Sequence, residues 1–324
     1  MSTHLGAARL MLGHAAASGE TFPDLDKAAR AKIFAAETAN TVTNDALQFY
    51  GSSGYGRHNP MERHVRDARM FTIAGGTAQV GGLPYAQALA GIRRAIADAR
   101  SDFGISGRLI AAIDREASPE AALEMVQWVV AQPCEEVVGI GIDYRENDRP
   151  PELFADAYRA ARQAGLKTTA HAGEFGMPWT NVRTAVELLQ VDRIDHGYTV
   201  VDAPDFARQC ADAGIVFTVV PTNSYYLRTL APERWALDHP IRRMPALGLR
   251  VHPNTDDPTL HHVTPTGAWR MMVRDFGFGL DDLRAFTDNG LQAAWIDAET
   301  RRAWRHEHLA EFDALRAQLE PSAF

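Results

Sequence analysis

The sequence predicts an α/β fold: an incomplete (β/α)8 TIM-type barrel of about six parallel strands, preceded by an α-helical segment. After Gly82, short β-rich runs alternate with amphipathic segments of helical spacing, which is the pattern of parallel βαβ units. Before that point, helix-forming residues dominate and two glycine-rich breaks occur. We therefore expect a helical segment over residues 1–80 and a partial barrel over residues 81–324.

The helical segment is organised around one long stretch without Gly or Pro, from Asp24 to Tyr50. Its content of Ala, Glu, Lys and Gln favours a single helix. The run from Gly51 to Pro60 should break this helix, and the glycines of Ala74 to Gly82 should form a second break.

The barrel-like region contains six β-rich runs, each followed by a loop or an amphipathic segment. Two of the amphipathic segments are bounded by helix signals, with Ser118 as N-cap before Pro119 in one, and Gly165 closing the other. The strands are expected in GRLIAAID (107–114), EVVGIGID (136–143), KTTAHAG (167–173), DRIDHG (192–197), IVFTVVPTN (215–223) and LRVHPNTDD (249–257). Because a closed barrel of this type has eight strands, we expect this one to lack the first two.

Bulk properties exclude several classes of protein. The formal net charge of -8 argues against a general nucleic-acid binder, which normally presents a basic face. No apolar run of about 18 residues predicts a membrane span, and the first residues lack the pattern of a secretory signal. Cys134 and Cys210 are too few for a disulfide framework, so we expect reduced cysteines and a cytoplasmic protein.

Polar residues collect where three of the predicted strands end. One strand ends in His171-Ala172-Gly173-Glu174, another in Asp195-His196-Gly197, and the last in Asn254-Thr255-Asp256-Asp257-Pro258. In such barrels the functional groups lie at the carboxyl ends of the strands. The three clusters together predict a metal-assisted hydrolase site, although each alone would be weak.

Each residue type suggests a role in that chemistry. Imidazole and carboxylate are ordinary ligands of Zn²⁺, so His171 and Asp256 are the metal-ligand candidates. Glu174 is placed to move a proton, and His196 to orient the attacking water. Asp257 should face the substrate from the other side of its strand end.

The motifs HAGE, DHG and NTDDP occur in the order found in the adenosine deaminase family, which residues 81–324 resemble. The resemblance implies one zinc ion bound by His171 and Asp256, and a purine nucleoside or base as the substrate. It also implies that Glu174 protonates a ring nitrogen, that His196 assists the attacking water, and that Asp257 and Gly173 bind substrate. The implied reaction releases ammonia from adenosine or a related purine or aminated heterocycle.

Two departures from the family pattern affect this expectation. The first strand of the family ends in a His-x-His pair that supplies two metal ligands, and no such pair follows a predicted strand here. With two ligands fewer, we expect weak zinc binding. Tyr144 occupies the position of a ligand-contacting glycine of the family, where it would crowd adenosine itself.

Residues 24–80 resemble a different family, the C-terminal helices of acyl-CoA dehydrogenases. Gln48 and the run from Gly51 to Gly56 match a turn that touches flavin in that family, and Gly75 stands where many members carry a catalytic Glu. About fifty residues cannot form a flavin site or an acyl pocket, so we expect a structural remnant.

Three interpretations remain open at the level of sequence. The first is a working deaminase whose absent ligands come from other histidines or from a partner chain. The second is a catalytically impaired fusion remnant that serves as an interaction module, its open barrel edges covered by a partner chain or by self-association. The third is flavin or acyl-CoA binding by the front segment.

Overall fold

The computed structural model describes residues 2–19, 24–56, 59–71, 85–227, 229–258 and 261–319. These residues form two compact units, residues 1–107 and 108–324. The boundary that we expected after residue 80 lies outside the described residues and stays a prediction.

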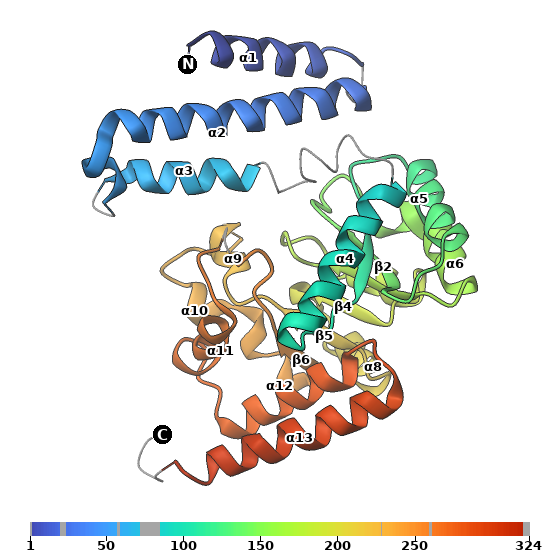
Figure 1. Ribbon diagram of the computed structural model, residues 1–324. Coiled ribbons are helices and arrows are strands. Elements are labelled where there is room, and N and C mark those ends of the chain that lie inside the picture. The colour runs from blue at the N-terminus through green and yellow to red at the C-terminus, as the bar shows by residue number, and fades with distance from the viewer. Residues whose placement is uncertain are drawn as a thin grey trace. The chain divides into compact units, whose positions relative to one another are not determined.

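The first unit is helical, as the sequence predicted. Helix α1 (Ser2–Ala16) packs on α2 (Leu25–Tyr55), which packs on α3 (Pro60–Phe71), and each helix runs antiparallel to the next (Figure 1). Helix α4 (Tyr85–Phe103) follows. The side chain of Asp24 caps α2 by accepting a hydrogen bond from the Lys27 N–H at 3.0 Å.

The break expected at Gly51 is a kink inside α2 and does not end it. Gly51 has φ 57° and ψ -142°, a conformation open mainly to glycine, and the helix continues beyond it to Tyr55. The expected helix therefore extends five residues past Tyr50.

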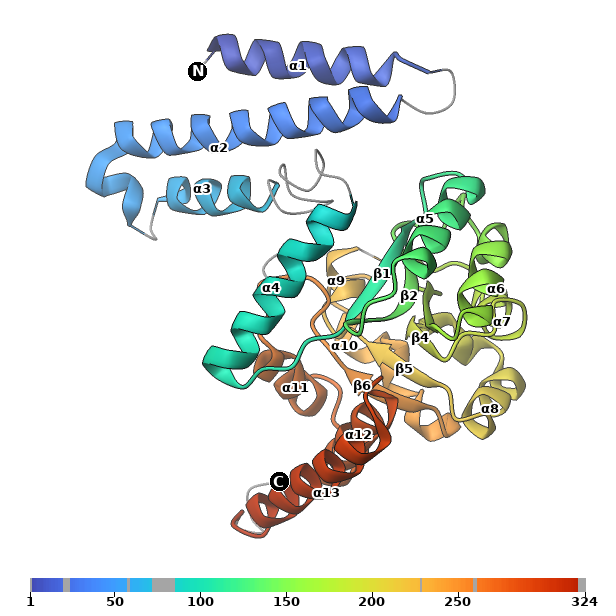
Figure 2. The ribbon, with the colours of Figure 1, turned by 45° about the vertical axis from the view of Figure 1, so that its right-hand side comes forward.

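The second unit is built on one sheet of six parallel strands in the order β1-β2-β3-β4-β5-β6. All six predicted strands are confirmed, and each lies within its predicted run (Figure 2). The strands are β1 (Leu109–Asp114), β2 (Val137–Asp143), β3 (Lys167–Ala172), β4 (Arg193–His196), β5 (Val216–Val219) and β6 (Arg250–Pro253).

Helices follow the strands and bury their apolar faces against the sheet. In α5 (Pro119–Ala131), Ser118 accepts a hydrogen bond from the Ala121 N–H at 3.2 Å and Pro119 opens the helix, as predicted. The core includes the fully buried side chains of Ile140, Ile194 and Phe217, which lie on β2, β4 and β5. The remaining helical elements are α5 (Pro119–Ala131), η2 (Pro151–Phe154), α6 (Ala155–Gln163), α7 (Thr180–Glu187), η3 (Tyr198–Asp202), α8 (Pro204–Asp212), α9 (Asn223–Tyr226), α10 (Trp235–Asp238), η4 (Pro240–Arg242), η5 (Pro245–Leu247), α11 (Pro265–Arg274), α12 (Leu280–Ala293) and α13 (Ala298–Arg316).

The sheet is open among the described residues, with β1 and β6 as its two edges. The incomplete parallel barrel is therefore confirmed, while its covering by a partner chain stays a prediction. Because all strands run the same way, their carboxyl ends lie at one rim, where the polar clusters meet. No helix of the described ranges is long and apolar enough to cross a membrane, and Cys134 and Cys210 are free.

Candidate metal and hydrolase site

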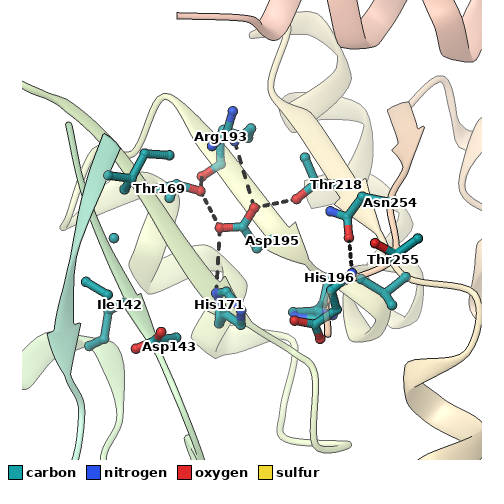
Figure 3. A pocket seen from close by; sticks show the side chains of 15 residues that line it. Ile142, Asp143, Thr169, His171, Arg193, Asp195, His196, Thr218, Asn254 and Thr255 are labelled. Atoms are coloured by element: carbon teal, nitrogen blue, oxygen red, sulfur yellow. Dashed lines mark hydrogen bonds and ion pairs between the residues drawn. The ribbon is translucent and has the colours of Figure 1, made fainter. Parts of the chain in front are cut away.

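A cavity of about 480 Å³ lies within the curve of the sheet and reaches the carboxyl ends of the strands. Its lining combines apolar side chains with histidine, carboxylate and hydroxyl groups, as Figure 3 shows. The lining residues are Ile110, Ala112, Gly141, Ile142, Asp143, Thr169, His171, Arg193, Asp195, His196, Thr218, Val220, Asn254, Thr255 and Asp256.

Three of the residues singled out in the sequence meet in this region. One ligand atom each from His171, Glu174 and His196 lies within 4.8 Å of the other two. The Nε2 atom of His196 is 3.7 Å from a carboxylate oxygen of Glu174, and the two imidazole rings have centroids 4.6 Å apart. His171 on β3 and His196 on β4 are 25 positions apart in the chain. They come together because Ala172 pairs with His196 in the parallel register.

The backbone at these strand ends is left-handed at several positions, two of which are consecutive. His196 has φ 67° and is followed by Gly197 at 73°, while Gly173 has φ 70° and Asp256 has φ 55°. A residue other than glycine in this conformation costs of the order of 1–3 kcal/mol, and such residues concentrate at functional sites. The tight turns direct side chains from the strand ends toward the cavity.

His196 is almost completely buried, at 1% exposure. Burial, and then the neighbouring His171, lower the pKa of His196 well below its usual value, so the imidazole is neutral near pH 7. Its Nδ1 atom lies 3.4 Å from the hydroxyl of Tyr198, which donates to the Val220 carbonyl and accepts from the Val220 N–H. These contacts fix the ring.

The two aspartates of the last motif occupy different places. Asp256 lines the cavity, and its N–H donates to the side chain of Asn254 at 2.8 Å. Asp257 is not among the lining residues, and burial followed by the charge of Asp256 raises its pKa. Asp256 does not belong to the compact donor cluster found among the described residues, so its role as a ligand stays a prediction.

Asp195 is a site residue to which the sequence interpretation gave no role. Its carboxylate accepts hydrogen bonds from the hydroxyls of Thr169, at 2.6 Å, and of Thr218, and it lies 3.6 Å from Nδ1 of His171. Burial opposes its ionisation, yet His171, Arg193 and the two hydroxyls hold its pKa below the usual value. An aspartate inside the predicted strand DRIDHG was the available signal, and only the pairing with the neighbouring strands shows that Asp195 faces His171.

Tyr144 follows β2 with φ 70°, the backbone region that glycine adopts most readily. Its side chain is 48% exposed. The preceding residue, Asp143, lines the cavity, and its buried Oδ1 atom has no hydrogen-bond partner. The loop therefore retains a glycine-type conformation with a large side chain at that position.

The donor set fits a divalent metal ion. It combines two imidazoles with a carboxylate, which are ordinary ligands of zinc. The buried Nδ1 atom of His171 has no hydrogen-bond partner, although Asp195 lies near it. A carboxylate commonly lies beside a histidine that ligates a metal, because it accepts a hydrogen bond from the other ring nitrogen and orients the ring.

One His-x-His sequence does occur in the chain, at His306 and His308. Both residues are exposed on helix α13 and do not end a strand. Side chains two residues apart on a helix face different directions, so this pair cannot act as the strand-end pair of the family.

Comparison with known proteins is consistent with a barrel of the amidohydrolase type. A Zn-bound amidohydrolase from Burkholderia ambifaria is 49% identical with a TM-score of 0.72, covering 90% of this chain and 75% of that one. An adenine deaminase from Arthrobacter aurescens, at 24% identity and a TM-score of 0.66, shares the fold over 95% of both chains.

Residues 66–310 match the adenosine deaminase family, and the chain belongs to that family. An adenine deaminase of Rhodopseudomonas palustris is 34% identical over 220 residues, which make up 68% of this chain and 63% of that protein. The deaminase resemblance inferred from the motifs is thus confirmed.

The front of the chain has separate relatives. Residues 1–90 match the acyl-CoA dehydrogenase C-terminal domain. The 3-sulfinopropanoyl-CoA desulfinase of Variovorax paradoxus is 88% identical over 80 residues, which are 25% of this chain and only 20% of that protein.

Proposed function

We propose that this protein catalyses the zinc-dependent hydrolytic deamination of a purine base, with release of ammonia. The observation that carries the proposal is the cluster of His171, Glu174 and His196 within 4.8 Å at the carboxyl ends of β3 and β4. The zinc ion of the Burkholderia amidohydrolase supports zinc as the metal, and we propose one ion in this chain.

His171 and Asp256 would hold the ion, with Glu174 and His196 beside it and available for proton transfer and for contact with the attacking water. A bound zinc ion would supply Lewis-acid activation of the attacking water. Glu174, buried at 7% exposure, would deliver a proton to a ring nitrogen, which makes the ring a better electron acceptor. His196, neutral through burial, would accept a hydrogen bond from the attacking water. Asp257 and Gly173 would bind the ring.

We propose adenine ahead of adenosine as the substrate. Relatives that are 31–34% identical are named adenine deaminase, and they come from several bacteria. Tyr144 stands in the loop beside the cavity, where its side chain would restrict the space for a ribose.

Ammonia release from a panel of purine bases and nucleosides tests this proposal. We expect turnover with adenine in the presence of zinc, and a loss of roughly 10²–10⁴-fold in kcat for Glu174→Gln, which keeps the size of the side chain but not its proton. Equal activity of Glu174→Gln and the unmodified chain would rule out the assigned proton transfer.

A catalytically impaired remnant is the second candidate, and the open sheet favours it. The described sheet has edges at β1 and β6, and unpaired strand edges favour association with another chain. Absence of both bound zinc and ammonia release in a folded preparation would support this interpretation over the first.

A further inference from the structure

A buried ion pair lies behind the loop that carries His171 and Glu174. Arg115 follows β1 and Glu146 follows β2, and both side chains have 0% exposure, with 4.0 Å between the nearest nitrogen and oxygen. Neither residue lines the cavity. A fully buried ion pair contributes little to stability compared with apolar packing. The role of this pair is therefore indicated by the groups that it contacts.

The Glu146 carboxylate binds the backbone of this loop. One of its oxygens accepts the Gly173 N–H at 3.0 Å, and the other accepts the Glu174 N–H at 2.9 Å. The side-chain amide of Asn181 donates a third hydrogen bond to it at 3.3 Å. Two consecutive backbone donors thus converge on one ionised group, and charge-assisted bonds of this type are the stronger class.

Arg115 binds the same loop from its other end. Its guanidinium donates to the His171 carbonyl at 2.7 Å and to the Tyr144 carbonyl at 3.3 Å. The pair therefore holds the carbonyl of the residue that opens the loop and the N–H groups of Gly173 and Glu174, which close it.

These bonds fix the left-handed turn at Gly173, whose φ is 70°. The turn sets the direction in which the Glu174 side chain leaves the backbone, and the Glu174 carboxylate lies 3.7 Å from Nε2 of His196. Proton transfer is sensitive to displacement, because a shift of about 1 Å in a reacting group can cost roughly a hundredfold in rate.

We propose that Arg115 and Glu146 are positioning residues that hold the His171–Glu174 loop so that the Glu174 carboxylate faces His196. This inference rests on the proposed function in assigning proton transfer to Glu174. It adds two residues that touch neither the cavity nor the proposed substrate.

The first measurement is amide hydrogen exchange of the full chain, which needs no turnover. In Glu146→Gln, an NH₂ group replaces one acceptor, and we expect exchange at Gly173 and Glu174 to rise by about tenfold or more. Asp192→Asn is the matched control, because Asp192 accepts the Thr168 N–H at 2.9 Å at the opposite end of β3. It should leave exchange at Gly173 and Glu174 unchanged, and unaltered exchange in Glu146→Gln would overturn the proposal.

The second measurement is a double-mutant cycle on kcat with adenine. We expect Glu146→Gln to lower kcat by roughly 10–100-fold in the unmodified chain and to have no further effect in the Glu174→Gln background. A purely structural role would lower kcat by the same factor in both backgrounds. If Glu146→Gln does not fold, Asn181→Ala, which removes one donor to Glu146, should give a smaller change of the same kind.

The outcomes separate the two proposals. If Glu174→Gln retains full turnover, or the unmodified chain has none, the proposed function fails, while the exchange data still decide whether the pair holds the loop. If Glu174→Gln lowers kcat as expected and a folded Glu146→Gln keeps the normal kcat, the positioning role fails and the function stands.

Discussion

The Glu174 carboxylate lies 3.7 Å from Nε2 of His196, although Glu174 follows β3 and His196 is the last residue of β4. Both side chains are buried, so the carboxylate and the imidazole face each other with little competition from bulk water. This relationship, with His171 beside it, makes the strand ends a candidate site for metal binding and proton transfer.

Removal of His171 should lower the metal content. We expect His171→Ala to reduce bound zinc to a small fraction of that in the unmodified chain, because it removes an imidazole from the only compact donor cluster of the described residues. Metal analysis after dialysis against a fixed free zinc concentration measures this. The double variant His306→Gln/His308→Gln is the control, and a comparable loss there would place the metal on α13 instead.

Glycine at position 197 should be required for stability. Gly197 has φ 73°, and an added Cβ atom would collide with the Phe217 ring. We expect Gly197→Ala to destabilise the fold by about 2–4 kcal/mol, combining left-handed strain with overpacking.

Gly214 provides the comparison for this substitution. It has φ 72°, but the nearest atom to an added Cβ is the flexible end of Arg250 at 3.3 Å. Left-handed strain alone should therefore lower the free energy of unfolding of Gly214→Ala, by about 1–2 kcal/mol. Urea unfolding of both variants measures the difference, and equal losses would show that the contact with Phe217 is unimportant.

Residue 144 should prefer glycine to alanine. Because Tyr144 has φ 70°, we expect Tyr144→Gly to be more stable than Tyr144→Ala by about 1 kcal/mol. Arg159 is exposed in helix α6, so there we expect the opposite order, with Arg159→Ala more stable than Arg159→Gly by about 1 kcal/mol. Thermal or urea unfolding of the four variants tests the inversion, and the same order at both positions would contradict it.

Stability should fall in acid partly through His239. Burial lowers the pKa of His239 from 6.5 to about 3, and its Nδ1 atom accepts the Ile241 N–H at 3.1 Å, which requires an unprotonated ring. Between these two values only the unfolded chain takes up the proton. The contribution of His239 to the free energy of unfolding is therefore complete above pH 6.5. It is lost as the pH falls toward 3, by at most about 1.4 kcal/mol per pH unit.

The variant His239→Asn tests this pH dependence, because asparagine can still cap the Ile241 N–H but does not titrate. Free energies of unfolding at several pH values should show a shallower decline for His239→Asn than for the unmodified chain. Identical slopes would show that His239 does not contribute.

The sequence by itself determined the strands, the helical front and the motif residues. Apolar runs such as VVGIGID and IVFTVV define strands because both faces of a parallel sheet are buried, and the glycines and caps between them set the ends of the helices. The residues His171, Glu174 and His196 were identifiable because charged groups directly after such strands have little structural reason to be there.

Only the tertiary structure decided which of these groups meet. The register of β3 with β4 brings His171 and His196 together, while Asp256 stays outside that donor cluster. Asp195 and the buried pair of Arg115 and Glu146 read in the sequence as ordinary charged residues. Their roles depend on contacts between residues 26–56 positions apart in the chain, which local sequence pattern does not encode.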